Sequence, residues 1–512
     1  MMTRFTSQSL SHHKENYYPF SLRERNMKEK IINWLFIFLI LIFIAGFSFI
    51  FLTTTSPVSR YYYGNDSAFF RVIGKEIIRG KSLYIDIWDH KGPILYLIQA
   101  IGALHGTRNE KISLIFVMEL FSFFLSVYFM YKANKKIAEN KFKLPLYFII
   151  VVCTFTVLGS FLQGGNLSED WSMPMICCSL YLFTDYAIHT TDDQLHPYKY
   201  AFFHGICLSL IAFIRINNAV TIIMGILVIA AYLVYKHQWE NLYKNILFGL
   251  LGIAVITIPL FVWFGLKKAV WEMLYATFFF NIKYSEGSAI SITGYALLLK
   301  FLPIAVSLVL ELLYLLKSRK FRFIDVMITA IIIANTAFFL IINRFDHYFI
   351  IYVPVFWLTL ILYTESRNIP SQIVLILVFS VYFNNTLNWG KYYMGAAQQP
   401  VFSTVNLYFP KSEKNSAIAI NVSPEIYLNT GIEPCSRFVA NQGGHFAVNP
   451  AFKQEFIETL REKKPLWIIG NCSADGTVPY AEFLPDLHYE LKFNDSTYCF
   501  FRQTEAKPGD FN

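Results

Sequence analysis

The chain has 512 residues, of which 55% are hydrophobic, 18% are aromatic and only 15% are charged. Soluble domains contain about 45–50% apolar and about 25% charged residues, so this composition excludes an ordinary water-soluble enzyme. The 7 cysteines and 25 glycines exclude a disulfide scaffold and a collagen-like chain, and the net charge of +9 is too diffuse to indicate nucleic-acid binding. These numbers predict an all-α polytopic membrane protein.

Eleven segments approach the length of about 20 predominantly apolar residues that a helix needs to cross a bilayer. They are Ile31–Leu52, Ile112–Tyr131, Leu144–Leu162, Trp171–Ile188, Tyr200–Ile214, Ala219–Tyr235, Asn245–Phe264, Ile292–Leu316, Ile324–Ile342, Tyr348–Tyr363 and Pro370–Leu387. The first segment is too long for a signal peptide, so we expect it to be a membrane helix. The shorter run Ile94–Leu104 is expected to be re-entrant or interfacial.

Basic residues orient these spans, because Lys and Arg collect in cytoplasmic loops. With the N-terminus inside, the basic stretches Arg23–Lys30, Lys132–Lys143, Lys236–Lys244 and Lys317–Arg322 all fall in the cytoplasm. The tail after Leu387 and five loops then face the exterior of the plasma (inner) membrane. The loops are Thr53–Pro93, Gln163–Asp170, Arg215–Asn218, Leu266–Ser291 and Asn343–His347.

Composition divides the chain into three parts: a cytoplasmic tail (1–30), a transmembrane domain (31–390) with a large first exterior loop (53–93), and an extracytoplasmic domain (391–512). The last part reads as a small α/β domain. Its strand-like runs are Ala417–Val422, Leu466–Gly470, Tyr489–Phe493 and Tyr498–Phe501, and Ala451–Lys463 has a helical pattern. Its three cysteines (Cys435, Cys472 and Cys499) leave open one disulfide and an odd thiol.

The first exterior loop contains the densest polar pattern of the sequence. Asn65–Arg79 has the apolar periodicity of an amphipathic helix that lies in the membrane surface, and Asp66 at its start is either an N-cap or a functional carboxylate. Asp86, Asp89, His90 and Lys91 follow within six positions. Lys91 precedes Gly-Pro at the start of a helix, where its ammonium group can reach a phosphate. The alternative is a lysine that snorkels from an apolar surface.

Three further exterior segments carry charges next to predicted spans. Glu169 and Asp170 begin a helix, where they either complement its dipole or accept hydrogen bonds from a sugar or bind a metal. Arg215 and Arg344 are guanidinium groups suited to bidentate phosphate binding. His347 and His90 are the candidate metal ligands if a divalent cation is bound. Arg215 and Arg344 could also belong to a plain turn and a charged helix flank.

The polar clusters gather at one membrane face, whereas the span interiors hold few charges, chiefly Glu119, Asp185 and Glu311. Transporters place ionisable groups deep in their spans, so an exterior active site is favoured over the alternative of a flippase or transporter of lipid-linked saccharides. A third interpretation is a membrane anchor for the C-terminal domain, for which eleven spans are excessive. The sequence lacks a P-loop, a His-Glu-x-x-His motif and a Cys-x-x-Cys zinc pair.

At Asp66, at Asp89-His90-Lys91-Gly92-Pro93 and at Glu169-Asp170, the chain resembles the GT-C superfamily of membrane glycosyltransferases. It is most similar to the bacterial branch related to protein O-mannosyltransferases and the lipid A aminoarabinose transferase. The resemblance covers the layout of about the first 390 residues and implies a GT-C-like fold of about eleven spans plus interfacial helices. His90 and Gly92 depart from the pattern of the family, which often has an acidic residue and a proline there.

The resemblance implies inverting transfer of a hexosyl or pentosyl group from a polyprenyl-phosphate donor to a glycan, lipid or protein acceptor of the cell envelope. Asp66 would be the general base, and Lys91 would hold the donor phosphate, with Arg215 and Arg344 as our additional candidates. Asp86, Asp89, Glu169, Asp170 and His347 are candidates for substrate binding. Membrane lipids are expected partners and nucleic acids are not, and a divalent cation is the one cofactor considered. The sequence does not specify the donor sugar or the acceptor.

Overall fold

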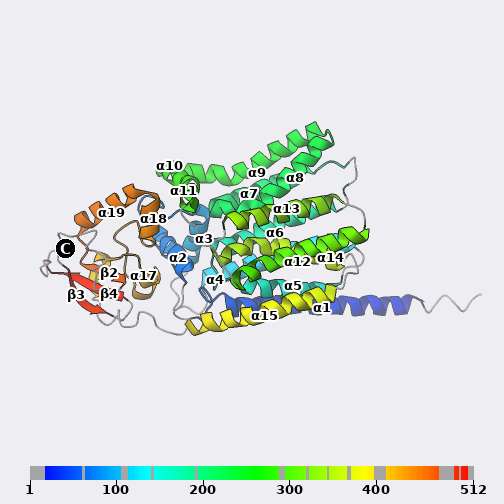
Figure 1. Cartoon of the computed structure of the whole chain (residues 1–512), viewed down its shortest axis with the longest axis horizontal. Coiled ribbons are helices and arrows are strands. Elements are labelled where there is room, and N and C mark those ends of the chain that lie inside the picture. The colour runs from blue at the N-terminus through cyan, green and yellow to red at the C-terminus, as the bar shows by residue number, and fades with distance from the viewer. Residues whose placement is uncertain are drawn as a thin grey trace, which may run out of the picture.

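The structure, a computed structural model, describes residues 18–59, 64–104, 113–139, 143–188, 190, 194–286, 295–318, 322–342, 345–365, 371–396, 411–471, 489–494 and 498–504. Long helices lie side by side in a bundle, and a smaller domain of short helices and strands covers one end of it (Figure 1). This arrangement agrees with the predicted fold class, an all-α membrane domain followed by a small α/β domain.

The bundle contains a helix over each of the eleven predicted spans. These helices are α1 (Tyr18–Phe51), α4 (Leu114–Ala138), α5 (Leu144–Gly159), α6 (Ser168–Ala187), α7 (Tyr198–Arg215), α8 (Val220–Tyr235), α9 (Trp239–Leu266), α12 (Tyr295–Ser318), α13 (Phe323–Ile341), α14 (Val353–Glu365) and α15 (Ser371–Ala396). The 3₁₀ turns η2 (Ile216–Ala219) and η4 (Asp346–Tyr352) precede α8 and α14.

Among the described residues, 7 helical segments are long and apolar enough to cross a membrane, with α7 and α8 counted together as Tyr198–Tyr235. The chain is therefore a multi-pass membrane protein. Helices α5, α6 and α15 are not among these segments. Helix α5 has only 16 residues, and α6 begins with two carboxylates. The count of eleven crossings stays a prediction.

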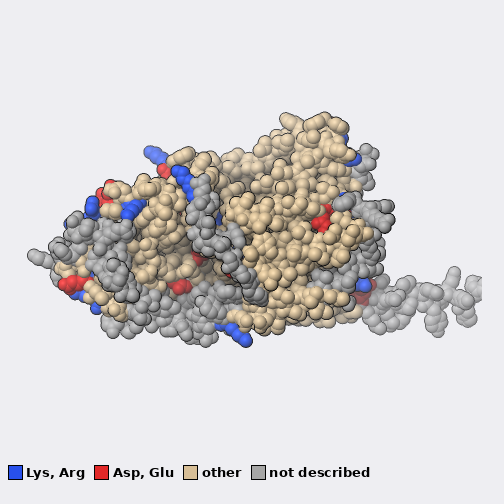
Figure 2. Space-filling view, in the orientation of Figure 1, with Lys and Arg blue, Asp and Glu red and all other residues tan. Residues whose placement is uncertain are grey.

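The surface of the bundle is suited to lipid. Figure 2 shows that its visible face is largely free of charged side chains, which gather over the C-terminal domain and near the ends of the bundle. Large apolar side chains such as Leu250, Ile258 and Leu266 of α9 are exposed. A membrane helix can expose such residues because lipid, and not water, contacts them.

Helices α7 and α9 pack at backbone distance. A Cβ atom built on Gly205 would lie 2.1 Å from the carbonyl oxygen of Gly249, and one built on Gly252 would lie 2.0 Å from that of Phe202. Small residues at helix contacts are typical of membrane proteins, in which close packing replaces the hydrophobic driving force. This contact fixes α7, whose last residue is Arg215.

Short helices lie between the bundle and the C-terminal domain (Figure 1): α2 (Asn65–Ile78), α3 (Pro93–Ala103), α10 (Val270–Leu274), the π-helical turn η3 (Tyr275–Phe279) and α11 (Phe280–Glu286). Helix α2 confirms the amphipathic helix predicted over Asn65–Arg79. Its apolar side chains Phe69, Val72 and Ile73 are buried against protein. The expectation that this apolar face contacts lipid is therefore wrong, because α3 and the C-terminal domain cover it.

The C-terminal domain is built on a four-stranded sheet of order β1-β2-β4-β3. Its strands are β1 (Ala417–Ala419), β2 (Trp467–Asn471), β3 (Tyr489–Asn494) and β4 (Tyr498–Gln503), which confirm the four predicted runs. Strand β1 pairs parallel to β2, and β4 pairs antiparallel to both β2 and β3. Its remaining elements are η5 (Lys411–Ser416), α17 (Glu425–Thr430), α18 (Gln442–Val448) and α19 (Pro450–Lys463). Helix α19 coincides with the predicted Ala451–Lys463.

A continuous apolar core joins the C-terminal domain to the first exterior loop. Trp88 of that loop is 1% exposed, and its ring lies 4.9 Å from that of Phe280 and 4.7 Å from that of Phe452. The backbone N–H of Trp88 donates to the carbonyl of Arg437 at 3.0 Å. Because buried aromatic side chains contribute large areas to a core, this cluster holds loop and domain as one unit.

The α7–α9 contact gives a testable prediction. Gly252→Val should lower the free energy of unfolding by about 1–3 kcal/mol, because its side chain must push the α7 backbone away. Gly46→Val in α1 is the matched control, since a Cβ atom at Gly46 meets nothing within 4 Å. Thermal unfolding of the detergent-solubilised proteins measures both, and equal melting temperatures for the two variants would contradict the prediction.

Candidate functional site

A cavity of about 780 Å³ lies where the bundle, the short helices and the C-terminal domain meet. Each of the five predicted exterior loops and the tail contributes to its lining. The lining includes Thr54, Asp66, His90, Lys91, Gln163, Leu167, Arg215, Tyr284, Phe345, His347, Tyr348, Asn421, Ser423, Asn441, Asn471 and Tyr498. Segments that are far apart in the sequence thus share one polar space at the end of an apolar bundle.

Asp66 lies in the first turn of α2, with its side chain 44% exposed to the cavity. The N-cap residue is Gly64, whose φ of 68° favours glycine and whose N–H donates to Glu425 Oε1 at 2.7 Å. The interpretation of Asp66 as the N-cap is therefore wrong. One carboxylate oxygen of Asp66 lies 3.9 Å from Nε2 of His347, so both side chains face the same space.

Lys91 is 8% exposed, and its Nζ lies 3.5 Å from Oδ2 of Asp89 and 4.9 Å from the centre of the Phe70 ring. Burial lowers the pKa of Lys91, but the Asp89 carboxylate and, more weakly, that of Asp66 outweigh this effect and raise the pKa above its usual value. Tyr84 holds the loop by donating its hydroxyl to the carbonyl of Lys91 at 2.7 Å. The ammonium group is thus charged and held at the cavity wall.

Two contacts of Gly92 explain why this position holds glycine and not the proline of the family pattern. Its N–H donates to the carbonyl of Ile214 at 3.0 Å, a bond that proline cannot make. A Cβ atom at this position would lie 2.1 Å from the carbonyl oxygen of Phe213. The loop therefore touches the backbone at the end of α7 directly, which brings Lys91 close to Arg215.

Arg215 is held in the cavity wall by two partners. One Nη donates to Glu169 Oε1 and the other to the Tyr348 hydroxyl, each at 2.6 Å, and the guanidinium lies 4.3 Å from the centre of the Tyr348 ring. Glu169 is 1% exposed and also accepts a hydrogen bond from Ser168. Glu169 thus positions Arg215, and its second oxygen is already bonded.

His347 joins two exterior loops. Its Nδ1 lies 3.0 Å from Oε1 of Gln163, and its ring stacks on that of Phe345. Gln163 has a φ of 49° and precedes Gly164 and Gly165, whose φ angles of 92° and 84° require glycine. Thr54 donates its backbone N–H and its hydroxyl to the carbonyl of Gly164 at 3.0 and 2.9 Å. This tight turn carries Gln163 to the cavity.

Four of the predicted site residues that the structure describes, Asp86, Asp89, Glu169 and Asp170, do not line the cavity. Asp86 is exposed and accepts the N–H of Ser82 at 2.7 Å within a turn. Asp170 caps α6 by accepting the N–H of Leu167 at 2.7 Å, as its helix-start interpretation predicts. Asp89 is fully buried behind Lys91. Arg344 lies outside the described residues.

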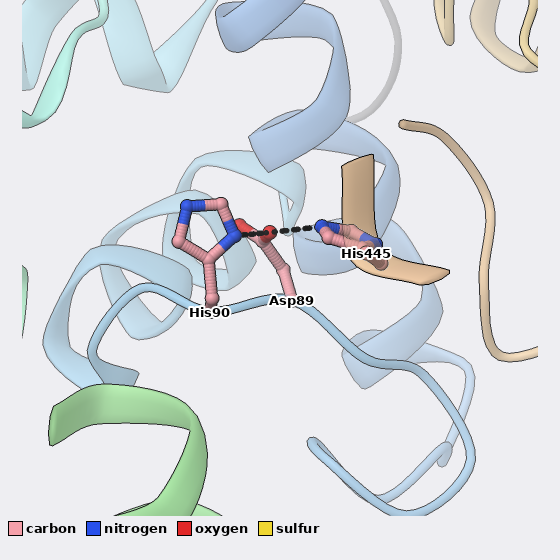
Figure 3. Close-up of side chains that lie close together, drawn as sticks. All are labelled: Asp89, His90 and His445. Carbon is pink, nitrogen blue, oxygen red and sulfur yellow. Dashed lines mark ion pairs between the residues drawn. The ribbon is translucent and has the colours of Figure 1, made fainter. Parts of the chain in front are cut away.

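Asp89, His90 and His445 form a buried cluster whose ligand-type atoms all lie within 4.8 Å of one another (Figure 3). Asp89 Oδ1 is 2.9 Å from Nδ1 of His90 and 3.6 Å from Nε2 of His445. Within the described part of the chain, none of these three atoms makes a hydrogen bond of acceptable geometry. Figure 3 shows both rings directed at the carboxylate, with His445 contributed by α18.

The electrostatics of this cluster suit a metal ligand set. Burial lowers the pKa of His90 to about 4, so the ring is neutral near pH 7 and has a lone pair for a metal. Burial raises the pKa of Asp89, but the Lys91 ammonium group opposes this effect and the pKa lies well below its usual value. One carboxylate and two imidazoles form a donor set that divalent transition metals bind. Of the two sequence candidates, His90 belongs to this cluster and His347 does not.

Several residues of the site were not predicted. Tyr348 and Gln163 flank predicted residues in their loops, so a wider reading of those loops finds them. His445 follows the turn signal Asn441-Gln-Gly-Gly, but nothing in the sequence pairs it with Asp89.

Of the three cysteines of the C-terminal domain, Cys499 is disulfide-bonded and Cys435 is free, whereas Cys472 lies outside the described residues.

Comparisons with known proteins agree with this fold. Residues 26–374 match the family model of the competence-induced protein Ccs4 N-terminal domain. The structure of ArnT from Cupriavidus metallidurans bound to undecaprenyl phosphate has a TM-score of 0.60 at 11% identity and covers 91% of this chain and 97% of that chain. ArnT in the apo state has a TM-score of 0.56 at 12% identity, with coverage of 93% and 98%. No curated protein matches the sequence.

An oligosaccharyltransferase from Archaeoglobus fulgidus, tethered with an acceptor peptide, aligns more loosely, with a TM-score of 0.48 at 13% identity over 92% of this chain and 74% of that chain. The two ArnT structures confirm the expected fold. At these identities the likeness concerns the path of the backbone, so the chemistry of the cavity has to be argued from its own residues.

The close approach at Gly92 gives a second prediction. Gly92→Ala should destabilise the protein by about 1–3 kcal/mol, because the new methyl group meets backbone atoms of Phe213 that cannot rotate away. Gly265→Ala is the control, since its Cβ would lie 4.0 Å from the nearest side chain. Thermal unfolding in detergent measures the effect, and a Gly92→Ala protein as stable as the control would refute this account of the contact.

Proposed function

The chain belongs to the competence-induced Ccs4 N-terminal domain family, and we propose that it is a GT-C type glycosyltransferase. In this proposal it moves a sugar from a polyprenyl-phosphate donor to a cell-envelope acceptor at the exterior face of the plasma membrane. One observation carries the proposal: a carboxylate, Asp66, and two cations, Lys91 and Arg215, line a single cavity at the end of an apolar bundle. The ArnT structure with undecaprenyl phosphate supports the donor class.

Lys91 and Arg215 are the groups we assign to the donor phosphate. Guanidinium and ammonium groups bind phosphate oxygens strongly when both are held in place. Asp89 holds Lys91, and Glu169 with Tyr348 holds Arg215. The two cations stabilise the charge that develops on the phosphate as the bond between the sugar C1 and the phosphate oxygen breaks, so they act mainly in the transition state.

Asp66 is the group we assign as general base. Its carboxylate accepts the proton of the acceptor hydroxyl while the acceptor oxygen forms its bond to C1, and the phosphate leaves with the electron pair of the broken bond. Attack on the face opposite the phosphate inverts the configuration at C1. A positioned base of this kind contributes about 10²–10⁴-fold to the rate. His347, 3.9 Å from Asp66, lies beside this proton transfer.

The exterior location and the domain division at residue 390 are parts of the same proposal. The disulfide at Cys499 supports an oxidising compartment for the C-terminal domain. The alternative of a flippase finds little support, because the interior carboxylates have local partners. Glu119 accepts from Thr55, Asp185 pairs with Lys136 at 2.7 Å, and Glu311 accepts from Thr329.

Asp66→Asn tests the proposed role of the base. The variant should lose about 10²–10⁴-fold in sugar transfer, because an amide cannot accept the proton, while its melting temperature stays unchanged. The measurement is turnover of a panel of radiolabelled undecaprenyl-phosphate sugars by the purified protein. Asp86→Asn, an exposed carboxylate of the same loop, is the matched control and should retain full activity. Normal turnover by Asp66→Asn would sink the assignment.

We also propose that Asp89, His90 and His445 hold a divalent transition metal. Bound there, the metal would tie the first exterior loop to α18 and so fix the wall that carries Lys91. Elemental analysis of the purified protein should find about one metal ion per chain. His445→Ala should lose that ion and melt at a lower temperature. His237→Ala, at an exposed histidine, should keep it. Equal metal content in both variants would refute the proposal.

A further inference from the structure

The wall of the cavity that the C-terminal domain contributes differs in chemistry from the rest. Its polar side chains are the carboxamides of Asn421, Asn441 and Asn471 with the hydroxyls of Ser423 and Tyr498. Among the described residues that the domain adds to the lining, none is charged. The charged groups Asp66, Lys91 and Arg215 come from α2, the first exterior loop and the end of α7. The cavity therefore has a charged half and a neutral, amide-rich half.

The topology of the sheet places these amides together. Strands β1 and β2 are parallel neighbours. Asn421 follows the end of β1, and Asn471 is the last residue of β2. Tyr498 pairs with Asn471 at the start of the antiparallel β4. In open α/β sheets, ligands bind outside the carboxyl ends of parallel strands, and this is the edge that faces the cavity.

Backbone conformation and hydrogen bonds position the asparagine side chains. Asn421 and Asn441 each have a φ of 52°, a region that asparagine adopts more readily than most residues. Asn421 Oδ1 accepts the N–H of Gly443 at 2.9 Å, and Asn471 donates its amide to the carbonyl of Asn421 at 3.3 Å. All three side chains are nevertheless exposed to the cavity. A wall built in this way is rigid before any ligand arrives.

The chemistry of the wall identifies what it binds. A carboxamide offers both donors and acceptors, and so does each hydroxyl of a sugar. A protonated amino sugar needs a carboxylate, and an acidic sugar needs a cation, and this wall offers neither. The described carboxylates near the cavity are engaged elsewhere: Glu169 binds Arg215 and Asp89 binds Lys91. Asp66 is the proposed base.

We propose that Asn421, Asn441 and Asn471 form a subsite for a neutral saccharide, the sugar of the acceptor. This inference rests on the proposed glycosyltransferase function. A polyprenyl-linked donor is tethered to the membrane and reaches the cavity from the bundle. The amide wall lies on the C-terminal domain, which covers one end of the bundle (Figure 1). A water-borne acceptor reaches that side, and Asp66 lines the same cavity.

Saturation-transfer NMR on the full chain in nanodiscs tests this subsite. The probes are the methyl glycosides of glucose and N-acetylglucosamine, which are neutral, and of glucosamine and glucuronic acid, which are charged. The neutral pair should give at least about threefold more signal than the charged pair, as expected from one unmatched charge. Asn441→Gly, which keeps the positive φ, combined with Asn471→Ala should abolish the neutral signal. Asn494→Ala, at an exposed asparagine of β3 that is not among the lining residues, is the matched control.

Asn441→Asp tests whether the charge of this wall sets the preference for neutral glycosides. The new carboxylate should raise the glucosamine signal above that of methyl glucoside without disturbing the backbone. A double variant that binds the neutral glycosides as well as the control does, or a wild-type protein that prefers a charged glycoside, would overturn the subsite. Binding of a serine- and threonine-rich peptide by a protein that binds none of the glycosides would also overturn the subsite.

Undecaprenyl phosphate as a second probe separates the two proposals. Its binding should require Lys91 and should be unaffected by the asparagine variants. Lys91-dependent binding of this lipid without any neutral glycoside signal would refute the subsite and leave the glycosyltransferase proposal standing. If the protein binds the neutral glycosides and Lys91→Met still binds the lipid normally, the assignment of Lys91 to the donor phosphate is refuted and the saccharide subsite stands.

Discussion

The backbone contact between Gly92 and the end of α7 is the constraint on which the site depends. The hydrogen bond from Gly92 to Ile214 leaves no room for a side chain between the first exterior loop and the bundle. It brings a loop lysine beside a helix-terminal arginine, although like charges repel. Each cation is compensated by its own buried carboxylate, Asp89 for Lys91 and Glu169 for Arg215. Two separate ion pairs therefore present an ammonium and a guanidinium group to one space.

The second constraint is the lipid around the bundle. Charged groups are costly in the membrane, so the polar chemistry of this chain gathers at one end of the helices. That end becomes a cavity only because the C-terminal domain closes it. The aromatic cluster around Trp88 and the hydrogen bond from Gly64 to Glu425 fasten the domain to the loop that carries Asp66. Fold and site are thus stabilised by the same contacts.

Much of this architecture follows from the sequence. Apolar runs and strand-like alternation predicted the long helices, the amphipathic α2 and all four strands, because these patterns have a local cause in burial. The same reading placed Asp66, Lys91, Arg215 and His347 on one face. It missed His445 and the asparagines, since their neighbours come from distant segments that only the tertiary fold brings together. It also assigned the apolar face of α2 to lipid, because sequence periodicity does not distinguish lipid from a protein partner.

The border between the charged and the amide-rich half of the cavity coincides with a border in the chain. Asp66, Lys91, Arg215 and His347 all lie within residues 26–374, the part that matches the family model. The amide wall lies entirely beyond it, in a domain that begins after α15. Under the two proposals above, reactivity and recognition are encoded in separate stretches of the gene. Exchange of the distal stretch alone would then retarget the protein without touching the groups assigned to bond breaking and bond formation.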